Sequence, residues 1–233
     1  MAKTPKRAQS SLRATVRLVV LVPLWCCAVF VSAGRIDWVR GWVWLIGFGG
    51  GVAVMGLLVR CANPGLLTAR ANLRRKDTKL FDKVCLAFYI PLELLQPIVG
   101  GLDAVRFRWS SMPFATVYPG LVLLALGMTL ATWALRVNPY AETTVRIQTD
   151  RGQKVVTSGP YLTVRHPMYV GGILMYPGVA LILGSMWALA LSGLIVIVMV
   201  WRTALEDRTL RRELPGYEEF ASVTRYRLIP RLW

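Results

Sequence analysis

The side chains best suited to chemistry lie in two short segments near the C-terminal end of the chain. The first covers residues 138–172 and contains His166, the only histidine, between Arg165 and Pro167. The second covers residues 201–208, in which Arg202 precedes Glu206 by four positions. On a helix this spacing puts both side chains on one face. The two segments therefore offer a cation, a carboxylate and an imidazole for recognising a charged ligand.

Two interpretations of Arg202 and Glu206 are open. They form a surface ion pair that contributes about 0.3 kcal/mol, or Arg202 binds an acceptor carboxylate or phosphate while Glu206 holds a cationic cofactor. Pro167 is well placed to begin a helix, and free N–H groups at a helix start suit an anionic ligand group beside His166. We favour the ligand-binding interpretation, because a helical hairpin would join His166 to the segment of Arg202.

Apolar segments must position these groups. The chain has 55% hydrophobic and only 17% charged residues, whereas soluble domains carry about 25% charged residues. Apolar runs close to the ~20 residues that cross a bilayer occupy residues 16–33, 38–59, 84–102, 114–135 and 168–200. The last run is too long for one span and contains Gly184-Ser185, which predicts two short helices joined by a tight turn.

The expected fold is an all-α integral membrane protein with about six transmembrane helices, of which the last two form a hairpin. Lys and Arg concentrate before the first span, between the second and third, between the fourth and fifth, and after the sixth. The opposite side has only Arg35, Arg40, Arg106 and Arg108. The positive-inside rule then puts both termini, and a pocket formed by the 138–167 loop and the C-terminal tail, in the cytoplasm. The net charge of +16 therefore reflects topology, and no nucleic-acid partner is expected.

Other reactive side chains give weaker indications. The four cysteines include no CxxC pair or Cys/His cluster, so neither a disulfide framework nor a metal site is expected. Glu93 lies in the middle of the third span, where an ionisable group suggests a function. A pair with Gln96, or with a carbonyl freed by Pro91, explains Glu93 equally well.

The run Gly159-Pro-Tyr161, Arg165-His-Pro-Met-Tyr169-Val-Gly171, followed one hairpin later by Arg202 and Glu206-Asp207, resembles the isoprenylcysteine carboxyl methyltransferase family. That family belongs to a wider group with phospholipid N-methyltransferases. The resemblance covers residues 138–233, and the first four spans match only as a generic membrane scaffold. It implies a four-span scaffold at 1–137 and a methyltransferase region at 138–233, within one integrated domain.

The resemblance implies S-adenosyl-L-methionine as the cofactor. Arg202 corresponds to the arginine associated with the acceptor, and Glu206 to the cofactor-binding glutamate; these two are the expected catalytic residues. Gln153 stands where the family usually has His, and Asp207 replaces the commoner second glutamate. The implied cofactor-binding residues are Gln148, Gln153, Lys154, Val155, Val156, Tyr161, His166, Pro167, Met168, Tyr169 and Glu206.

The expected acceptor is a lipid or a lipid-modified molecule that reaches the enzyme from the bilayer. No dedicated general base is apparent, which favours transfer to a carboxylate, because a carboxylate is nucleophilic as it stands whereas an amine must first lose a proton. Methylation of a phospholipid amine or another small hydrophobic nucleophile stays open. An NADPH-dependent membrane reductase and a non-catalytic membrane scaffold are more distant alternatives. The sequence leaves the oligomeric state open.

Overall fold

The computed structural model describes residues 27–72 and 77–233, and its regular elements there are all helical. In chain order they are α2 (Val39–Trp44), a π-helical turn (Leu45–Gly49), α3 (Gly50–Ala62), α4 (Leu66–Arg70), α5 (Leu80–Gly101), a second π-helical turn (Leu102–Phe107), α6 (Val117–Val137), α7 (Pro167–Leu183), α8 (Met186–Glu213) and α9 (Tyr217–Val223). Short 3₁₀ turns occupy Phe114–Thr116, Thr149–Arg151 and Gly159–Leu162. The expectation of an all-helical fold is confirmed for the described part of the chain.

Four of these helical stretches are long and apolar enough to cross a membrane: Val39–Ala62, Leu80–Phe107, Phe114–Val137 and Met186–Glu213. Helix α7 is also apolar but has only 17 residues. The first predicted span, 16–33, lies largely outside the described residues. These helices make the chain an integral membrane protein, as its composition indicates.

The long apolar block at 168–200 is divided as predicted, but its second helix is not short. Helix α7 ends before Gly184, which adopts φ 77°, and α8 begins after Ser185, whose side chain accepts a hydrogen bond from Ala188 N. Helix α8 then continues past Val200 to Glu213. The extension forms because residues 201–213 contain good helix formers such as Ala, Leu, Glu and Arg, with no Gly or Pro.

Helices α6 and α7 pack closely because glycines face each other across the pair. A Cβ atom added to Gly171 would lie 2.6 Å from the carbonyl oxygen of Gly127 and 3.0 Å from the Cβ of Ala131. One added to Gly178 would lie 2.8 Å from the carbonyl oxygen of Gly120. Small residues of this kind let the backbones of membrane helices approach each other. The contact fixes α7 against α6.

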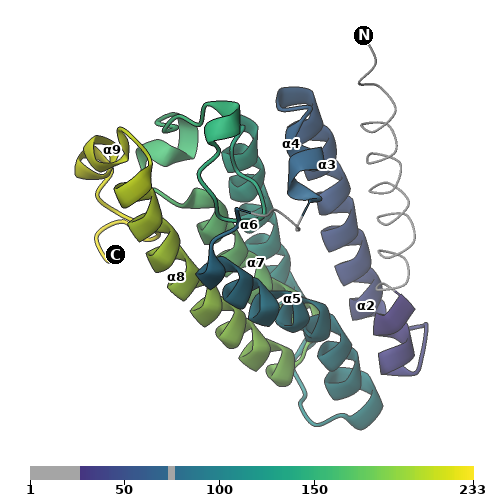
Figure 1. Cartoon of the computed structure of the whole chain (residues 1–233). Coiled ribbons are helices and arrows are strands. Elements are labelled where there is room, and N and C mark those ends of the chain that lie inside the picture. The colour runs from purple at the N-terminus through teal and green to yellow at the C-terminus, as the bar shows by residue number, and fades with distance from the viewer. Residues whose placement is uncertain (1–26, 73–76) are drawn as a thin grey trace.

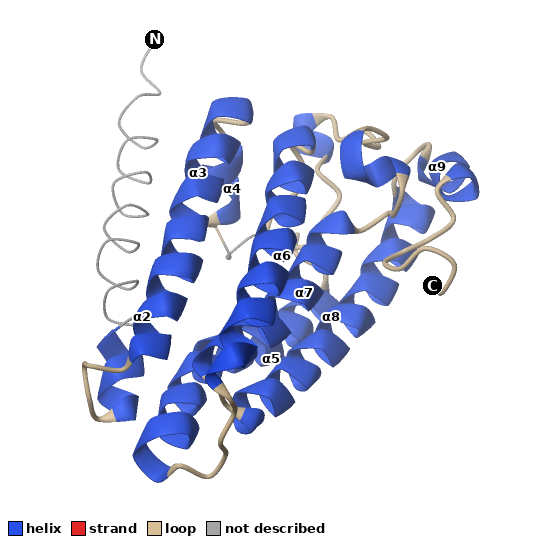
Figure 2. Ribbon diagram, turned by 180° about the vertical axis from the view of Figure 1, so that it is seen from behind, coloured by secondary structure: helices blue, strands red, loops and turns tan. Residues whose placement is uncertain are grey.

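The helices hold the polar segments together at one end of the bundle. Figure 1 shows the loop after α6, the C-terminal part of α8 and α9 gathered there, with the C-terminus beside them. Seen from behind in Figure 2, α6, α7 and α8 run side by side, and α7 packs against both α6 and α8. Helix α5 packs against α8. The start of α7 and the last turns of α8 thus meet the same loop.

Candidate active site

A pocket lies between the loop of residues 138–166, the start of α7, the last turns of α8, and α9. Its cavity has a volume of about 90 Å³ and is partly open to solvent. Its lining includes these residues predicted from sequence: Gln148, Gln153, Lys154, Val155, Val156, Tyr161, His166, Met168, Tyr169, Arg202 and Glu206. Pro167 is not part of the lining; it begins α7. The fold therefore brings together nearly all the predicted cofactor-binding residues.

Tyr169 contacts both of the charged groups that α8 contributes. Its hydroxyl donates a 2.5 Å hydrogen bond to Glu206 Oε2. The Arg202 guanidinium lies 5.6 Å from the centre of the Tyr169 ring. Arg202 and Glu206 form no ion pair with each other, although they are one helical turn apart. The surface ion pair considered for them is therefore wrong, and the pocket has a negative and a positive side.

The carboxylate of Glu206 has no cationic partner among the described residues, where its hydrogen-bond partner is neutral Tyr169. The buried carboxylates near it are paired: Glu142 with Arg146, Asp207 with Arg165, and Asp82 with Arg202. A carboxylate facing a pocket without a counter-ion is suited to a cationic ligand.

The guanidinium of Arg202 is held by Asp82, an aspartate that the sequence analysis did not predict to be part of the site. Its Nε donates a 2.7 Å hydrogen bond to Oδ1 of Asp82, a fully buried residue on α5. Its Nη2 donates to the carbonyl oxygen of Thr143 at 2.6 Å. Asp82 Oδ2 also accepts from the backbone N–H of Val145. Helix α5 and the loop thus orient the guanidinium, whose Nη1 is left for a ligand.

Asp207 is the centre of a second buried network. Its carboxylate accepts hydrogen bonds from Arg165 Nε at 2.7 Å and Arg227 Nε at 2.9 Å. The Tyr217 hydroxyl donates to it at 3.1 Å, and His166 Nε2 lies 3.3 Å away. Burial raises the pKa of Tyr217, so its hydroxyl stays a donor. Asp207 therefore holds His166 in the pocket wall.

The same network attaches the last residues of the chain to the pocket. Arg165 Nη1 donates to the carbonyl oxygens of Thr224 and Arg225, each at 2.8 Å. The backbone N–H of His166 donates to Arg227 O at 3.0 Å. The Arg-His pair thus connects the start of α7 with the C-terminal segment 224–233.

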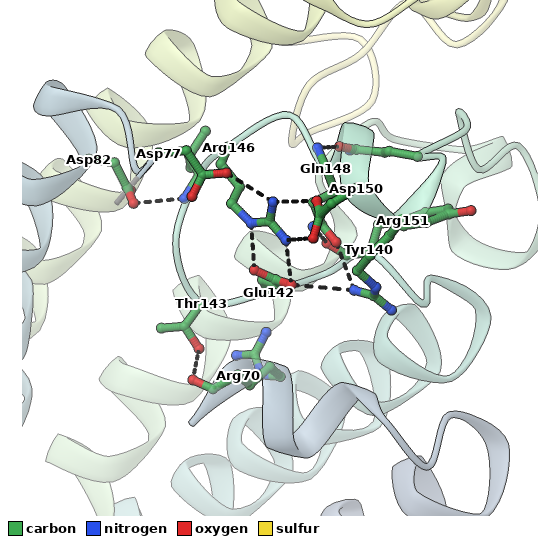
Figure 3. A network of polar contacts seen from close by, with 12 residues as sticks. Arg70, Asp77, Asp82, Tyr140, Glu142, Thr143, Arg146, Gln148, Asp150 and Arg151 are labelled. Carbon is green, nitrogen blue, oxygen red and sulfur yellow. Dashed lines mark hydrogen bonds and ion pairs between the residues drawn. The ribbon is translucent and has the colours of Figure 1, made fainter. Parts of the chain in front are cut away.

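A third network, drawn in Figure 3, stiffens the outer wall of the pocket. Arg146 donates to Glu142 Oε2 at 3.0 Å, to Asp150 Oδ1 at 2.7 Å and to Asp77 Oδ2 at 3.0 Å. These bonds, the one to Glu142 first, raise the pKa of Arg146. Arg151 donates to Glu142 as well. The loop lacks regular structure, and this network gives it a fixed shape.

Two of the predicted cofactor-binding residues use their side chains for hydrogen bonds within the protein. Gln148 Nε2 donates to Tyr140 O at 2.6 Å, and its Oε1 accepts from Arg151 at 2.7 Å. Gln153 Oε1 accepts from the backbone N–H of Gln148. Both amides support the wall of the pocket. Tyr161, whose hydroxyl accepts from Asn138 Nδ2, is also buried, and burial raises its pKa to about 12.

Several lining residues were missed by the sequence analysis. Glu142 and Arg146 carry the i, i+4 spacing of an ion pair, but in a loop this spacing has no clear meaning. The apolar side chains of α8 and α9 follow the pattern of an ordinary amphipathic helix, so nothing in the sequence marks them as pocket residues. The missed lining residues are Asn138, Tyr140, Ala141, Glu142, Thr144, Val145, Arg146, Arg165, Leu210, Leu214, Tyr217 and Phe220.

Glu93 lies outside this pocket. Glu93 and Gln96 form no hydrogen bond with each other, and the amide of Gln96 is used elsewhere. Gln96 instead donates to Tyr176 O at 2.8 Å and to Ser192 Oγ at 2.7 Å. The pair of Glu93 with Gln96 is therefore wrong, and Gln96 connects α5 with α7 and α8.

Comparison with known proteins fits this site. Residues 115–215 match the family model described as phospholipid methyltransferase. The match runs from the start of α6 to the end of α8, so it includes the loop, His166 and the pair Arg202 and Glu206. A comparison with curated proteins found no match. Residues 115–215 are therefore similar to the phospholipid methyltransferase family.

Proposed function

We propose that the protein is an S-adenosylmethionine-dependent methyltransferase that methylates the carboxylate of a lipophilic, isoprenylcysteine-like acceptor. One observation carries the proposal: Glu206, without a cationic partner among the described residues, and Arg202, with a free guanidinium edge, face one pocket on either side of Tyr169. A cationic cofactor and an anionic acceptor need these two charges side by side. The family match supports methyl transfer.

The pocket suits the proposed cofactor. S-adenosylmethionine, when bound, supplies a methyl group that its sulfonium charge has already activated. Glu206 binds the cationic part of the cofactor, and its bond from Tyr169 keeps the carboxylate aimed at the pocket. Val155, Val156 and Phe220 give the apolar surface that an adenine ring needs. Gln148 and Gln153 hold the loop around it.

The protein has little other chemistry to supply. An acceptor carboxylate is nucleophilic as it stands, so the residues of the site bind, orient and exclude water. Arg202 orients the carboxylate through charge-assisted hydrogen bonds. Asp82 keeps the guanidinium in place. Alignment of two reactants in this way can contribute about 7–11 kcal/mol.

The membrane arrangement belongs to the same proposal. We place both termini and the pocket in the cytoplasm, because the basic residues gather on that side. Helices α7 and α8 form the last two of six spans, as a hairpin. At 1.5 Å per residue, the 17 residues of α7 reach about 26 Å, which is near the lower limit for a span. Residues 1–137 serve as the scaffold and 138–233 carry the chemistry.

A phospholipid amine is the second candidate acceptor, because the matching family model carries that description. An amine needs a base, and Glu206 is the carboxylate in the pocket that is free of an ion pair. His166 is less suited to this role, since Asp207 and Tyr217 surround its Nε2.

Calorimetry with the purified protein in detergent tests the proposal. S-adenosylmethionine and NADPH are titrated in parallel into the wild type and into Arg202→Lys. We expect S-adenosylmethionine to bind both proteins and NADPH to bind neither, with methyl transfer lost in Arg202→Lys. Binding of NADPH alone would assign the protein to the reductases, and binding of neither would favour a non-catalytic scaffold.

A further inference from the structure

Arg70, the last residue of α4, lies next to the pocket, in a part of the chain expected to serve as scaffold. Its Nη1 donates to Ala141 O at 2.7 Å and lies 3.5 Å from Met168 Sδ. Ala141 and Met168 both line the pocket. The side chain of Arg70 therefore lies directly behind the pocket wall.

No carboxylate pairs with Arg70 among the described residues. The buried arginines around it differ: Arg146, Arg165 and Arg202 each pair with an acid. Arg40 has no acidic partner among the described residues either, but both its terminal nitrogens donate to carbonyl oxygens. In Arg70, Nη1 is bonded, whereas Nε and Nη2 have no protein acceptor in the described part of the chain. Its guanidinium therefore keeps donors for a ligand.

The loop connects Arg70 with Arg202. The Thr143 hydroxyl donates to the backbone oxygen of Arg70 at 2.9 Å, and the Thr143 carbonyl accepts from Arg202 Nη2 at 2.6 Å. Figure 3 shows Arg70 beside Thr143, below the Arg146 network. Burial, and to a smaller extent the nearby charge of Arg202, lower the pKa of Arg70. An anion between them would relieve both effects.

The surroundings of Arg70 are apolar. Leu66 and Leu67, on the same short helix, pack with Val59, Leu135 and Met168. A ligand whose charged group contacts Arg70 would therefore have hydrophobic side chains next to it, as a lipid headgroup does and a free inorganic anion does not.

We infer that Arg70 and Arg202 together bind the anionic group of the lipid acceptor, a carboxylate or a phosphate. This inference rests on the proposed function and makes Arg70 a further substrate-binding residue. The acceptor then meets two cations, and one free carboxylate, Glu206, is left for the cofactor. Arg70 holds the acceptor from the α4 side while Arg202 holds it from α8.

The test is calorimetric titration of octanoate and octyl phosphate, with octanol and octylamine as neutral and cationic probes, into the full chain in a non-ionic detergent. We expect both anions to bind the wild type and the other two probes not to bind measurably. Arg70→Gln should weaken anion binding about tenfold or more, the loss of one charged pair. Arg70→Lys, which keeps the charge but not the planar donors, should weaken it less.

Arg60→Gln is the matched control, because Arg60 is an exposed arginine in the last turn of α3. It should bind the anions as the wild type does. Tighter binding of octanoate would indicate a carboxylate acceptor, and tighter binding of octyl phosphate a phospholipid. Equal binding of all four probes, or wild-type anion affinity in Arg70→Gln, would overturn the inference. If Arg70→Gln fails to fold, wild-type affinity in Arg70→Lys together with binding of octylamine would overturn it.

These titrations contain no cofactor, so their outcome is separate from that of the S-adenosylmethionine titration. A protein that binds anions through Arg70 but no S-adenosylmethionine would contradict the proposed function alone. One that binds the cofactor but not the anions would contradict only the role of Arg70.

Discussion

The Tyr169 hydroxyl donates a 2.5 Å hydrogen bond to Glu206, while the ring of the same tyrosine lies 5.6 Å from the Arg202 guanidinium. One side chain from α7 thus separates the two opposite charges that α8 presents to the pocket. Arg202 forms its ion pair with Asp82 instead. Glu206 is therefore left without an ion pair in the described part of the chain.

The role of Asp207 can be tested with Asp207→Asn. Asp207 is fully buried and accepts from Arg165 and Arg227, so the change leaves the buried guanidinium of Arg165 without its counter-ion. Loss of one partner of a buried ion pair costs about 3–5 kcal/mol. We expect the C-terminal segment to detach and trypsin to cleave after Arg225 and Arg227. Glu219→Gln, at an exposed site on α9, is the control; cleavage no faster than in this control would show that Asp207 does not hold the segment.

Close packing of α6 and α7 predicts a contrast between two Gly→Ala substitutions. In Gly171→Ala the new methyl group would press on Gly127 O, and overpacking of this kind costs about 1–3 kcal/mol. Gly193 on α8 has no atom within 4 Å of an added Cβ, so Gly193→Ala should be neutral or stabilising. Apparent melting temperatures in detergent compare the two. Equal melting temperatures would mean that the glycine contact does not determine how the two helices pack.

Tyr161 predicts a loss of stability at high pH. Its pKa in the folded protein is about 12, against about 10 in an unfolded chain. Below pH 10 the tyrosine is protonated in both the folded and the unfolded state. Above pH 10 the unfolded chain loses the proton first. The free energy of unfolding therefore falls between about pH 10 and pH 12, by at most about 1.4 kcal/mol per pH unit. Tyr161→Phe should make the fall less steep by up to this slope.

The melting temperature between pH 9 and 12 measures this effect. Tyr118→Phe serves as the control because the ring of Tyr118 is exposed on α6. If the pH profiles of Tyr161→Phe and the wild type coincide, burial of Tyr161 does not affect its ionisation.

Sequence reasoning found the site where the signal is local. His166 and Tyr169 lie within one helical turn, and Arg202 and Glu206 within another, so their grouping can be read from spacing. The family match confirms the resemblance. Residue pairs distant in the chain could not be read in this way: Asp82 contacts Arg202 across 120 positions, and Arg70 contacts Ala141 across 71. Both come from segments that look like generic membrane scaffold, and only the packing of α4 and α5 on the loop brings them to the pocket.

Gln148 illustrates a different limit. The resemblance implies that Gln148 binds the cofactor. The residue is only 2% exposed, however, and both its Nε2 and its Oε1 form hydrogen bonds within the protein. Its partners, Tyr140 O and Arg151, depend on the shape of an irregular loop. The Arg146 network determines that shape, and the sequence of the loop has no periodic pattern from which it could be predicted.

The most direct test of the account is S-adenosylmethionine affinity in Glu206→Gln, measured by calorimetry beside the wild type and Glu219→Gln. The substitution keeps the size of the side chain and its bond from Tyr169 but removes the charge. We predict that Glu206→Gln binds the cofactor at least about tenfold more weakly, or about 1.4 kcal/mol, and that Glu219→Gln binds it normally. Wild-type affinity in Glu206→Gln would contradict the assignment of this carboxylate to the cofactor.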